Sequence, residues 1–468
     1  MPLILGTNSI KDTGFDVANS LRFDDGSSDS LTRTQTAGNR RTFTLSFWVK
    51  RSELGSDEAI FNINNGNQPY ARIYFNDNGA FHIDDYDGNQ DTDLRTNRFF
   101  RDVSAWYHIV VAYDTTQSTA SNRIKLYVNG VQETSFSTET YPAQNFDTEY
   151  NNNSQVLEIG DYVNTDFFNG YLSEVIMIDG TALDPTSFGE FDSDSPTIWK
   201  PIDVSGLTFG TNGFYLDFED SSSLGNDAAG SNNFTVNNLT AIDQSTDTCT
   251  NNFATLNPLA SGVAIGGSAG TFTDGNLFFS GASSAWCATK GTFSVTQGKW
   301  YMEAKKTTNA NGTGNGAGAV SVGFAELQSN LGNNNPQNDS SIYNSILVVN
   351  DNGWTTNFAN GTQWSTPQAV DDGDIVGIAL DLDSNNYTFY VNGTQVDTGS
   401  LGGGYDGNGL TPCIINYGGD TREFTCNFGS PPYSISSGNS DGNGYGNFEY
   451  AVPSGYYALN TKNLAEYG

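Results

Sequence analysis

The sequence is poor in basic residues, and it lacks any long apolar run. Lys and Arg total 20 against 53 Asp and Glu, which gives a formal net charge of −33 and a pI near 4.1. This charge would repel a phosphate backbone and an anionic membrane surface, so we expect neither nucleic acid nor lipid as a partner. No stretch of about 20 apolar residues is present, and we therefore expect no membrane insertion.

Cysteine and histidine are also scarce, which limits the chemistry that the chain can support. Four cysteines in 468 residues are too few for a disulfide scaffold, and no CxxC pair suggests a structural zinc site. The two histidines, His82 and His108, lie in strand-like runs, where we expect packed or hydrogen-bonded side chains. No GxSxG nucleophile motif occurs. We therefore expect no enzyme and assign no catalytic residue.

The N-terminus "MPLILGTNSIKDTG" has an apolar patch but no basic region, so it does not match a secretory signal peptide. The composition nevertheless resembles that of an extracellular adhesin or lectin. A protein released by cell lysis, such as a virus particle component, would explain both observations. The alternative is a mature chain whose leader was removed.

What the sequence does contain is short alternating runs separated by Gly, Asn, Asp and Ser. In "TFTLSFWVK" (42–50) apolar residues alternate with others, so one face of the expected strand carries Phe43, Leu45, Phe47 and Val49. "LYVNG" (126–130) and "FYVNG" (389–393) share the same hairpin signal, in which we expect Leu126 and Phe389 to face the core and Tyr127 and Tyr390 to face the other way. The Asn-Gly pairs suit type I′ turns because both central residues need φ > 0. We expect an all-β fold of two antiparallel β-sandwich (jelly-roll) domains joined by an irregular connector. The predicted boundaries are an N-terminal arm at 1–18, a first sandwich at 19–195, a connector with short strands at 196–265, and a second sandwich with a C-terminal tail at 266–468.

These motifs also carry a family resemblance. The order of "FTLSFWVK", "WYHIVVAYD", "IKLYVNGV", "LEIGD" and "FNGYLSEVIMIDGTAL" across 21–190 resembles laminin-G-like, concanavalin-type jelly rolls. Across 270–435, "GKWYMEAK", "VGFAE", "DGDIVGIALDLDSNNYTFYVNG" and "CNFGSPPY" resemble an SPRY domain. The whole arrangement, with "DTCTNNFATLNP" and "GYYALNTKNL", resembles structural proteins of tailed bacteriophages.

This resemblance implies a protein on the virion surface, assembled in the host cytoplasm and released by lysis. It would be a fibre, spike or capsid appendage that binds host-surface glycans. Its apolar residues 3–5 would attach the N-terminal arm to other virion proteins. Phage fibres are often homotrimers, but the sequence contains no heptad or β-helix repeat that would enforce a trimer. Two alternatives stay open, a purely structural capsid decoration or tail connector, and a glycan-degrading enzyme on a concanavalin-type fold.

Candidate binding residues follow from residue type and position. Glycan binding needs aromatic platforms beside polar groups, and five aromatic residues lie in or beside polar segments: Tyr70, Tyr86, Trp354, Trp364 and Tyr405. A calcium ion takes six to eight oxygen ligands. The segment "IDDYDGNQDTD" (83–93) offers such ligands from Asp84, Asp85, Asp87, Asn89 and Asp91.

Two residue pairs complete the predictions. The enzyme alternative would use Asp217 and Glu219 in "YLDFED", because acids two residues apart on a strand share one face. A two-residue hairpin at Gly419-Asp420 would place Cys413 directly opposite Cys426. We therefore predict adjacent thiols that could oxidise to a disulfide after release from the cytoplasm.

Overall fold

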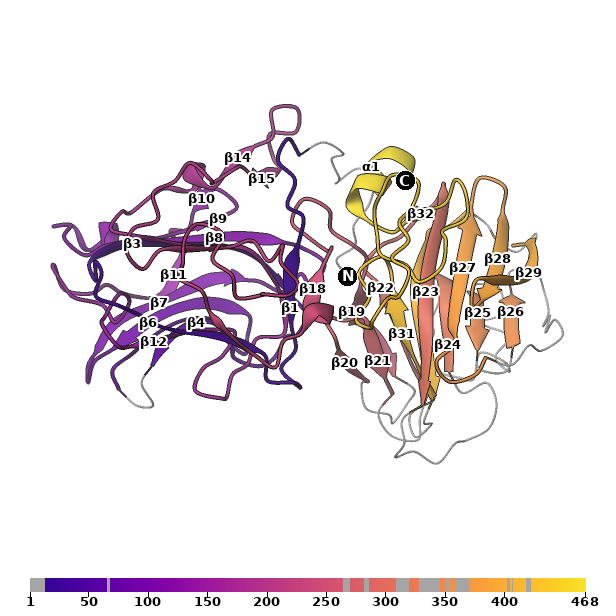
Figure 1. The fold of residues 1–468 in the computed structure, drawn as a ribbon, viewed down its shortest axis with the longest axis horizontal. Coiled ribbons are helices and arrows are strands. Elements are labelled where there is room, and N and C mark those ends of the chain that lie inside the picture. The colour runs from indigo at the N-terminus through magenta and orange to yellow at the C-terminus, as the bar shows by residue number, and fades with distance from the viewer. Residues whose placement is uncertain are drawn as a thin grey trace. The chain divides into compact units, whose positions relative to one another are not determined.

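The computed structural model describes residues 13–64, 68–263, 270–281, 286–308, 320–327, 346–350, 353–357, 370–401, 405, 407–417 and 422–468 (Figure 1). The chain forms two compact units, which meet in sequence between Thr250 and Asn251. Both units consist of antiparallel sheets, as the sequence predicts. Within the described part of the chain, no helix is both long and apolar enough to cross a bilayer.

The first unit, beginning at Thr13, is a sandwich of two eight-stranded sheets (Figure 1). We call the first the β3 sheet, in the order β10 (Val131–Gln132), β9 (Ile124–Val128), β8 (Tyr107–Asp114), β3 (Thr42–Arg51), β13 (Gly170–Asp179), β1 (Ser20–Phe23) and β18 (Gln244–Ser245), with β16 (Phe214–Leu216) also paired to β13. The second is the β6 sheet, in the order β11 (Phe136–Thr140), β7 (Gln90–Phe99), β6 (Ala80–Tyr86), β5 (Tyr70–Phe75), β4 (Glu58–Asn64), β12 (Val156–Ile159), β2 (Ser30–Thr34) and β17 (Thr235–Asn237).

The core of this unit lies between the two sheets, where the alternating residues of each strand meet. Phe43, Leu45, Phe47 and Val49 of β3 are fully buried in one cluster with Ile73 and other side chains of the β6 sheet. The outer face of the β3 sheet is covered in part by a short ribbon, β14 (Gly189–Phe191) and β15 (Trp199–Pro201). Because successive side chains of a strand point to opposite faces, the residues between those of the core lie on the outer face of each sheet, where a ligand could reach them.

The predicted connector is not a separate segment, and this differs from the sequence expectation. Its strands β16, β17 and β18 pair with β13, β2 and β1 of the first unit, so the sandwich extends to Thr250 rather than ending at residue 195. The predicted N-terminal arm is shorter than expected, because Val17 is buried and its backbone N–H donates to Thr250 Oγ1 at 3.0 Å. Residues 1–12 lie outside the described part.

The second unit, from Asn251 to Gly468, is also a two-sheet sandwich. The β30 sheet has the order β19 (Leu256–Val263), β22 (Trp286–Gly291), β30 (Leu410–Tyr417), β24 (Val320–Glu326), β25 (Ile346–Asn350) and β26 (Gly353–Asn357). The β23 sheet has the order β20 (Thr271–Thr273), β21 (Phe278–Ser280), β31 (Arg422–Asn427), β23 (Lys299–Thr308), β27 (Ile375–Asp381), β28 (Asn386–Val391) and β29 (Thr394–Ser400). In the C-terminal tail, β32 (Tyr457–Ala458) joins β23 in parallel and α1 (Thr461–Tyr467) buries Leu464.

Both Asn-Gly hairpins have the predicted turn. Asn129 and Gly130 have φ values of 47° and 77°, and Asn392 and Gly393 have φ values of 50° and 73°. In each turn the asparagine side chain accepts a backbone hydrogen bond, from His108 N at 2.8 Å in the first and from Ile375 N at 3.0 Å in the second. The repeated phrase therefore marks the same structural element in two different sandwiches.

Candidate ligand-binding face of the first unit

The outer face of the β6 sheet carries aromatic, basic, acidic and imidazole side chains close together. In β5, Ala71 and Ile73 point into the core, so Tyr70, Arg72 and Tyr74 point outward. These three residues stand directly opposite Tyr86, Asp84 and His82 of β6 in the antiparallel register. Side chains in such cross-strand pairs lie close enough to interact. The alternation of two strands thereby gathers six aromatic and charged groups on one face.

Arg72 is the centre of this arrangement. Its Nη2 and Nε atoms donate to the two carboxylate oxygens of Asp84 at 2.7 and 3.2 Å, forming a bidentate ion pair. The guanidinium carbon lies 4.5 Å from the ring centroids of both Tyr74 and Tyr162, and 5.2 Å from that of Tyr70. Because Arg72 is held by a carboxylate and three aromatic rings, its position is well fixed.

We define the tyrosine–arginine face as Tyr70, Arg72, Tyr74, Tyr86 and Tyr162. The rings of Tyr70 and Tyr86 are nearly parallel, with centroids 5.5 Å apart, and Tyr162 meets Tyr70 edge-on at 6.0 Å. Tyr70, Tyr86 and Tyr162 are each partly exposed, and their hydroxyl groups have no hydrogen-bond partner among the described residues. Partial burial raises the pKa of the Tyr70 and Tyr162 hydroxyls, so both remain protonated donors at neutral pH.

A second set of polar groups borders the face. His82 is hydrogen-bonded through Nδ1 to the Tyr74 hydroxyl and through Nε2 to Asp93 Oδ1 at 2.7 Å. Burial lowers the pKa of His82, which favours the neutral ring. Asn62 donates to Glu158 on the adjacent strand pair. The face therefore combines exposed aromatic rings with oriented donors and acceptors, which is the combination that polyhydroxylated ligands require.

The other predicted aromatic residues do not join this face. Tyr405 packs partly against the core of the second unit, and its hydroxyl donates to the Asn408 carbonyl at 3.0 Å. Trp354 is in β26 opposite Val349, at the edge of the β30 sheet. Trp364 lies outside the described residues. Of the five predicted residues, the structure brings together Tyr70 and Tyr86.

The predicted calcium ligands are not gathered at one point. Residues 80–99 form the β6–β7 hairpin rather than a loop, so neighbouring side chains alternate between the two faces. Asp84 points outward to Arg72, while Asp85 is 1% exposed on the opposite side. Burial raises the pKa of Asp85 well above its ordinary value, because desolvation disfavours the charged carboxylate. Asp87 and Asn89 are exposed at the turn and Asp91 is partly buried. No set of three or more His, Cys, Asp or Glu side chains in the described part is arranged to hold a metal ion.

The predicted acid pair is also separated. Strand β16 ends at Leu216, and Phe218 has a φ of 58°, so Asp217 and Glu219 do not share one face of a strand. The notable acid nearby is Glu174, at a bulge in β13, with both carboxylate oxygens accepting from the Tyr215 hydroxyl at 3.0 and 2.9 Å. Sequence reasoning missed Glu174, because nothing in "GYLSEVIMIDG" marks the bulge at which its side chain is buried beside Tyr215.

The two predicted cysteine partners are in different sheets. Cys413 lies in β30, between β22 and β24, while Cys426 lies in β31, beside β23. The prediction that Cys413 and Cys426 pair directly across a hairpin is therefore wrong, because β30 and β31 belong to different sheets. The predicted turn at 419–420 lies outside the described residues. None of the four cysteines forms a disulfide, and burial raises the pKa of Cys413 to about 12.

His108 has the structural role that the sequence suggests. It is fully buried on the outer side of β8, where its Nδ1 accepts from Trp199 Nε1 at 2.9 Å and its Nε2 lies 2.9 Å from Ser46 Oγ. Since Nδ1 is the acceptor, Nε2 carries the proton and donates to the hydroxyl. Burial lowers the pKa of His108 to about 3, so the ring stays neutral.

Comparison with known families defines the two units as domains. Residues 25–186 match the laminin-G family model described as the concanavalin A-like lectin/glucanases superfamily, and residues 299–429 match the SPRY domain. The chain thus carries a laminin-G/concanavalin-like jelly roll followed by an SPRY domain, as the resemblance implied. A search of curated protein sequences finds no match.

Several solved structures match parts of the chain at low identity. The SPRY domain of human HERC1 is 15% identical, with 36% of this chain and 96% of that chain covered and a TM-score of 0.28. A SAP-like pentraxin from Limulus polyphemus is 17% identical over 36% of this chain and 79% of that one, with a TM-score of 0.28. A putative carbohydrate binding protein from Bacteroides ovatus is 15% identical over 48% of this chain and 59% of that one, with a TM-score of 0.32.

Proposed function

We propose that the first unit binds host-surface glycans on its tyrosine–arginine face. The observation that carries this proposal is the group of partly exposed tyrosines around Arg72, with three hydroxyls that no described residue engages. Tyrosine rings supply rigid contact area at a low entropic cost, and their hydroxyls supply hydrogen bonds. A lectin-type jelly roll is the domain class in which such a face is expected.

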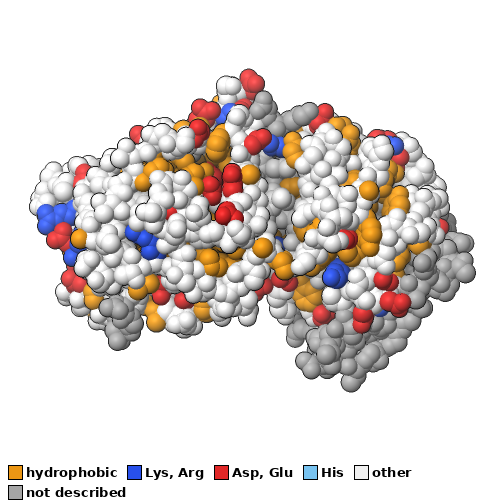
Figure 2. All heavy atoms as spheres, viewed as in Figure 1, with side chains coloured by type: hydrophobic (Ala, Val, Ile, Leu, Met, Phe, Trp, Pro, Cys, Tyr) orange, Lys and Arg blue, Asp and Glu red, His pale blue; other side chains and the backbone are white. Residues whose placement is uncertain are grey.

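Charge indicates which glycans would bind. The guanidinium of Arg72 is already neutralised by Asp84, and Glu158 and Asp93 lie on the same side of the sheet. The whole chain has a net charge of −33, and carboxylates outnumber basic side chains on the surface drawn in Figure 2. Long-range repulsion would therefore disfavour polyanionic glycans. We propose neutral glycans, held by stacking and hydrogen bonds without catalysis.

The direct test is a glycan array with the full chain, followed by titration calorimetry on the strongest ligand. Tyr86→Ala and Tyr162→Ala remove partly exposed rings, and each should weaken binding by about tenfold, since an aromatic contact contributes on the order of 1.5 kcal/mol. Phe191→Ala is the matched control, because it removes an exposed aromatic ring on β14, away from the β6 sheet.

The outcomes separate the proposal from its alternatives. Loss of binding in both tyrosine variants with retention in Phe191→Ala supports the proposed face. Absence of binding to every neutral glycan would contradict it and favour a purely structural role. Release of reducing ends from a bound polysaccharide would contradict binding without catalysis and favour the glycan-degrading alternative.

We further propose that this chain acts on a phage virion, as a fibre, spike or capsid appendage. The support is the resemblance of the whole chain, including residues 247–258 and 455–464, to structural proteins of tailed bacteriophages. Antibody labelling of particles in electron micrographs would locate the chain on head, tail or fibre tip. Particles that lack the label would contradict this placement without affecting the glycan-binding proposal.

A further inference from the structure

A cavity of about 290 Å³ opens on the β3 sheet, which is the other sheet of the first unit. Its floor is formed by β8 and β9, where Val111 and Leu126 point into the core and their neighbours point outward. Pockets of about 300–1,000 Å³ enclose drug-sized molecules, so this cavity suits a ligand of about one sugar ring. The lining consists of Ala112, Asp114, Gln117, Asn122, Lys125, Tyr127, Ala182, Leu183 and Asp184.

Three hydrogen-bonding groups of the lining are unused. The Lys125 ammonium, the Asn122 side-chain amide and the Tyr127 hydroxyl have no partner among the residues that the structure describes. Lys125 and Tyr127 are half-buried, and burial raises the pKa of the Tyr127 hydroxyl, with a contribution from the Asp184 carboxylate. Tyr127 therefore remains a neutral donor at physiological pH.

The two carboxylates of the lining are engaged to different degrees. Asp114 accepts from Thr116 Oγ1 at 2.5 Å through Oδ1 and from Gln117 Nε2 at 2.6 Å through Oδ2. Asp184 uses Oδ1 to accept from Thr186 N at 2.9 Å, where it caps the short 3-10 helix η3 (Pro185–Ser187). No described donor contacts Asp184 Oδ2. The cavity thus presents three free donor groups, and its free acceptors include Asp184 Oδ2 and the Asn122 amide oxygen.

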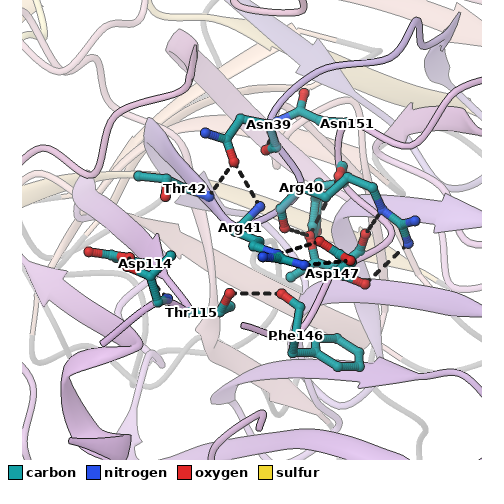
Figure 3. Close-up of polar contacts among 12 residues, drawn as sticks. Asn39, Arg40, Arg41, Thr42, Asp114, Thr115, Phe146, Asp147 and Asn151 are labelled. Atoms are coloured by element: carbon teal, nitrogen blue, oxygen red, sulfur yellow. Dashed lines mark hydrogen bonds and ion pairs between the residues drawn. The ribbon is translucent and has the colours of Figure 1, made fainter. Parts of the chain in front are cut away.

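The floor of the cavity, formed by β8 and β9, is held in place by the segment 142–148. Thr115 Oγ1 donates to the Phe146 carbonyl at 2.7 Å, next to Asp114, as Figure 3 shows. Arg123 Nη1 donates to the Pro142 carbonyl at 2.7 Å. Arg41 holds Asp147 of the same segment through two hydrogen bonds of 2.6 and 3.1 Å (Figure 3). Because these hydrogen bonds already fix the floor, it loses little conformational entropy when a ligand binds.

We propose that this cavity binds a single neutral sugar residue, such as the terminal hexose of a glycan. A sugar ring carries alternating hydroxyl groups that can donate to Asp184 Oδ2 and accept from Lys125, Asn122 and Tyr127. An anionic ligand is disfavoured, because the lining holds two carboxylates against one ammonium. The cavity shares no residue with the tyrosine–arginine face, so the proposal does not depend on that face.

The cavity opens on the outer side of the β3 sheet, whereas the tyrosine–arginine face lies on the outer side of the β6 sheet. The two sites therefore point in opposite directions and would bind separate glycan chains. Binding at both raises the apparent affinity only where glycans surround the domain, as in a polysaccharide layer. The cavity thus adds a second, independent glycan site to the proposed function.

The test is saturation-transfer NMR with the full chain and the methyl glycosides of glucose, galactose, mannose and N-acetylglucosamine, with methyl glucuronate as the anionic probe. We expect saturable binding of at least one neutral glycoside, with a Kd of about 1 mM. Lys125→Met should weaken it about tenfold, since hydrogen bonds from charged groups contribute on the order of 1.5 kcal/mol, and Asn122→Ala about fivefold.

Two control variants make the result decisive. Asn153→Ala removes an exposed asparagine outside the cavity, and Tyr86→Ala alters the tyrosine–arginine face; both should bind the glycosides as the wild type does. The proposal is overturned if no neutral glycoside binds or if methyl glucuronate binds more tightly. It is also overturned if Lys125→Met and Asn122→Ala leave the Kd unchanged.

Discussion

The buried carboxylate of Glu174 makes the stability of the first unit depend on pH, and a single substitution tests this. Glu174 is 5% exposed and has a φ of 50° at the bulge of β13. Burial raises its pKa from an ordinary 4.5 to about 8, and the Tyr215 hydroxyl opposes this shift by hydrogen bonding to the charged form. Asp217, Glu219 and Asp203 raise it further by repulsion.

The sign and size of the effect follow from proton linkage. Between pH 4.5 and about 8 the folded unit keeps a proton on Glu174 that the unfolded chain releases, so stability falls as pH rises through this window. At about 1.36 kcal/mol per pKa unit, the interval from 4.5 to about 8 corresponds to at most about 5 kcal/mol. Relaxation of the folded unit around the charged carboxylate reduces this cost, and we expect a loss of unfolding free energy of about 2–3 kcal/mol.

Glu174→Gln keeps the shape and the contact with Tyr215 but removes the titrating proton. We expect the variant and the wild type to have similar free energies of unfolding at pH 5, and the variant to be about 2–3 kcal/mol more stable at pH 9. Urea unfolding of the full chain, followed by tryptophan fluorescence at several pH values, measures this difference. Because other carboxylates titrate in both proteins, only the difference between the two curves reports Glu174.

One result would refute the reasoning. If the difference in unfolding free energy is the same at pH 5 and pH 9, Glu174 does not carry the proposed proton. Tyr215→Phe provides a second check, since loss of the hydroxyl removes a group that stabilises the charged carboxylate. That variant should therefore lose stability more steeply than the wild type as pH rises.

Two further predictions concern the framework that holds both candidate sites. Arg51→Met should destabilise the first unit by about 3–5 kcal/mol, because it leaves the fully buried Glu58 without its ion-pair partner, and adding Glu58→Leu should recover most of this in urea unfolding. Recovery of none of the loss would contradict that explanation. Gly130→Ala should lower the melting temperature more than Gly55→Ala. Both glycines have a positive φ, so both substitutions strain the backbone. Only at Gly130 would the added Cβ also clash with a neighbour, since it would lie 2.3 Å from the Trp199 ring, whereas the space around Gly55 is open. Equal decreases in melting temperature would contradict the contribution of the Trp199 clash and would leave backbone strain as the sole cause.

The sequence specified the parts of this fold that depend on local pattern. Alternation assigned Phe43, Leu45, Phe47 and Val49 to the core, and the Asn-Gly pairs fixed two type I′ turns. The same period of two in "YARIYF" could have revealed that Arg72 and Tyr74 share the face of Tyr70. These features are predictable because strand geometry and turn conformation depend on a few neighbouring residues.

The parts that could not be predicted depend on contacts between distant segments. The order of residues does not show that β16, β17 and β18 complete the first sandwich, because strands of two or three residues carry almost no pattern of their own. Nor does it show that Tyr162 reaches Arg72, or that Cys413 and Cys426 belong to different sheets.

The repeated Asn-Gly phrase shows the division clearly. The sequence alone determined that Leu126 faces the core and Tyr127 faces outward. Only the tertiary structure placed Tyr127 in a cavity, because the opposite wall at 182–184 comes from a segment more than 50 positions away. Local sequence fixes the direction of a side chain, and the packing of remote segments decides what that side chain meets.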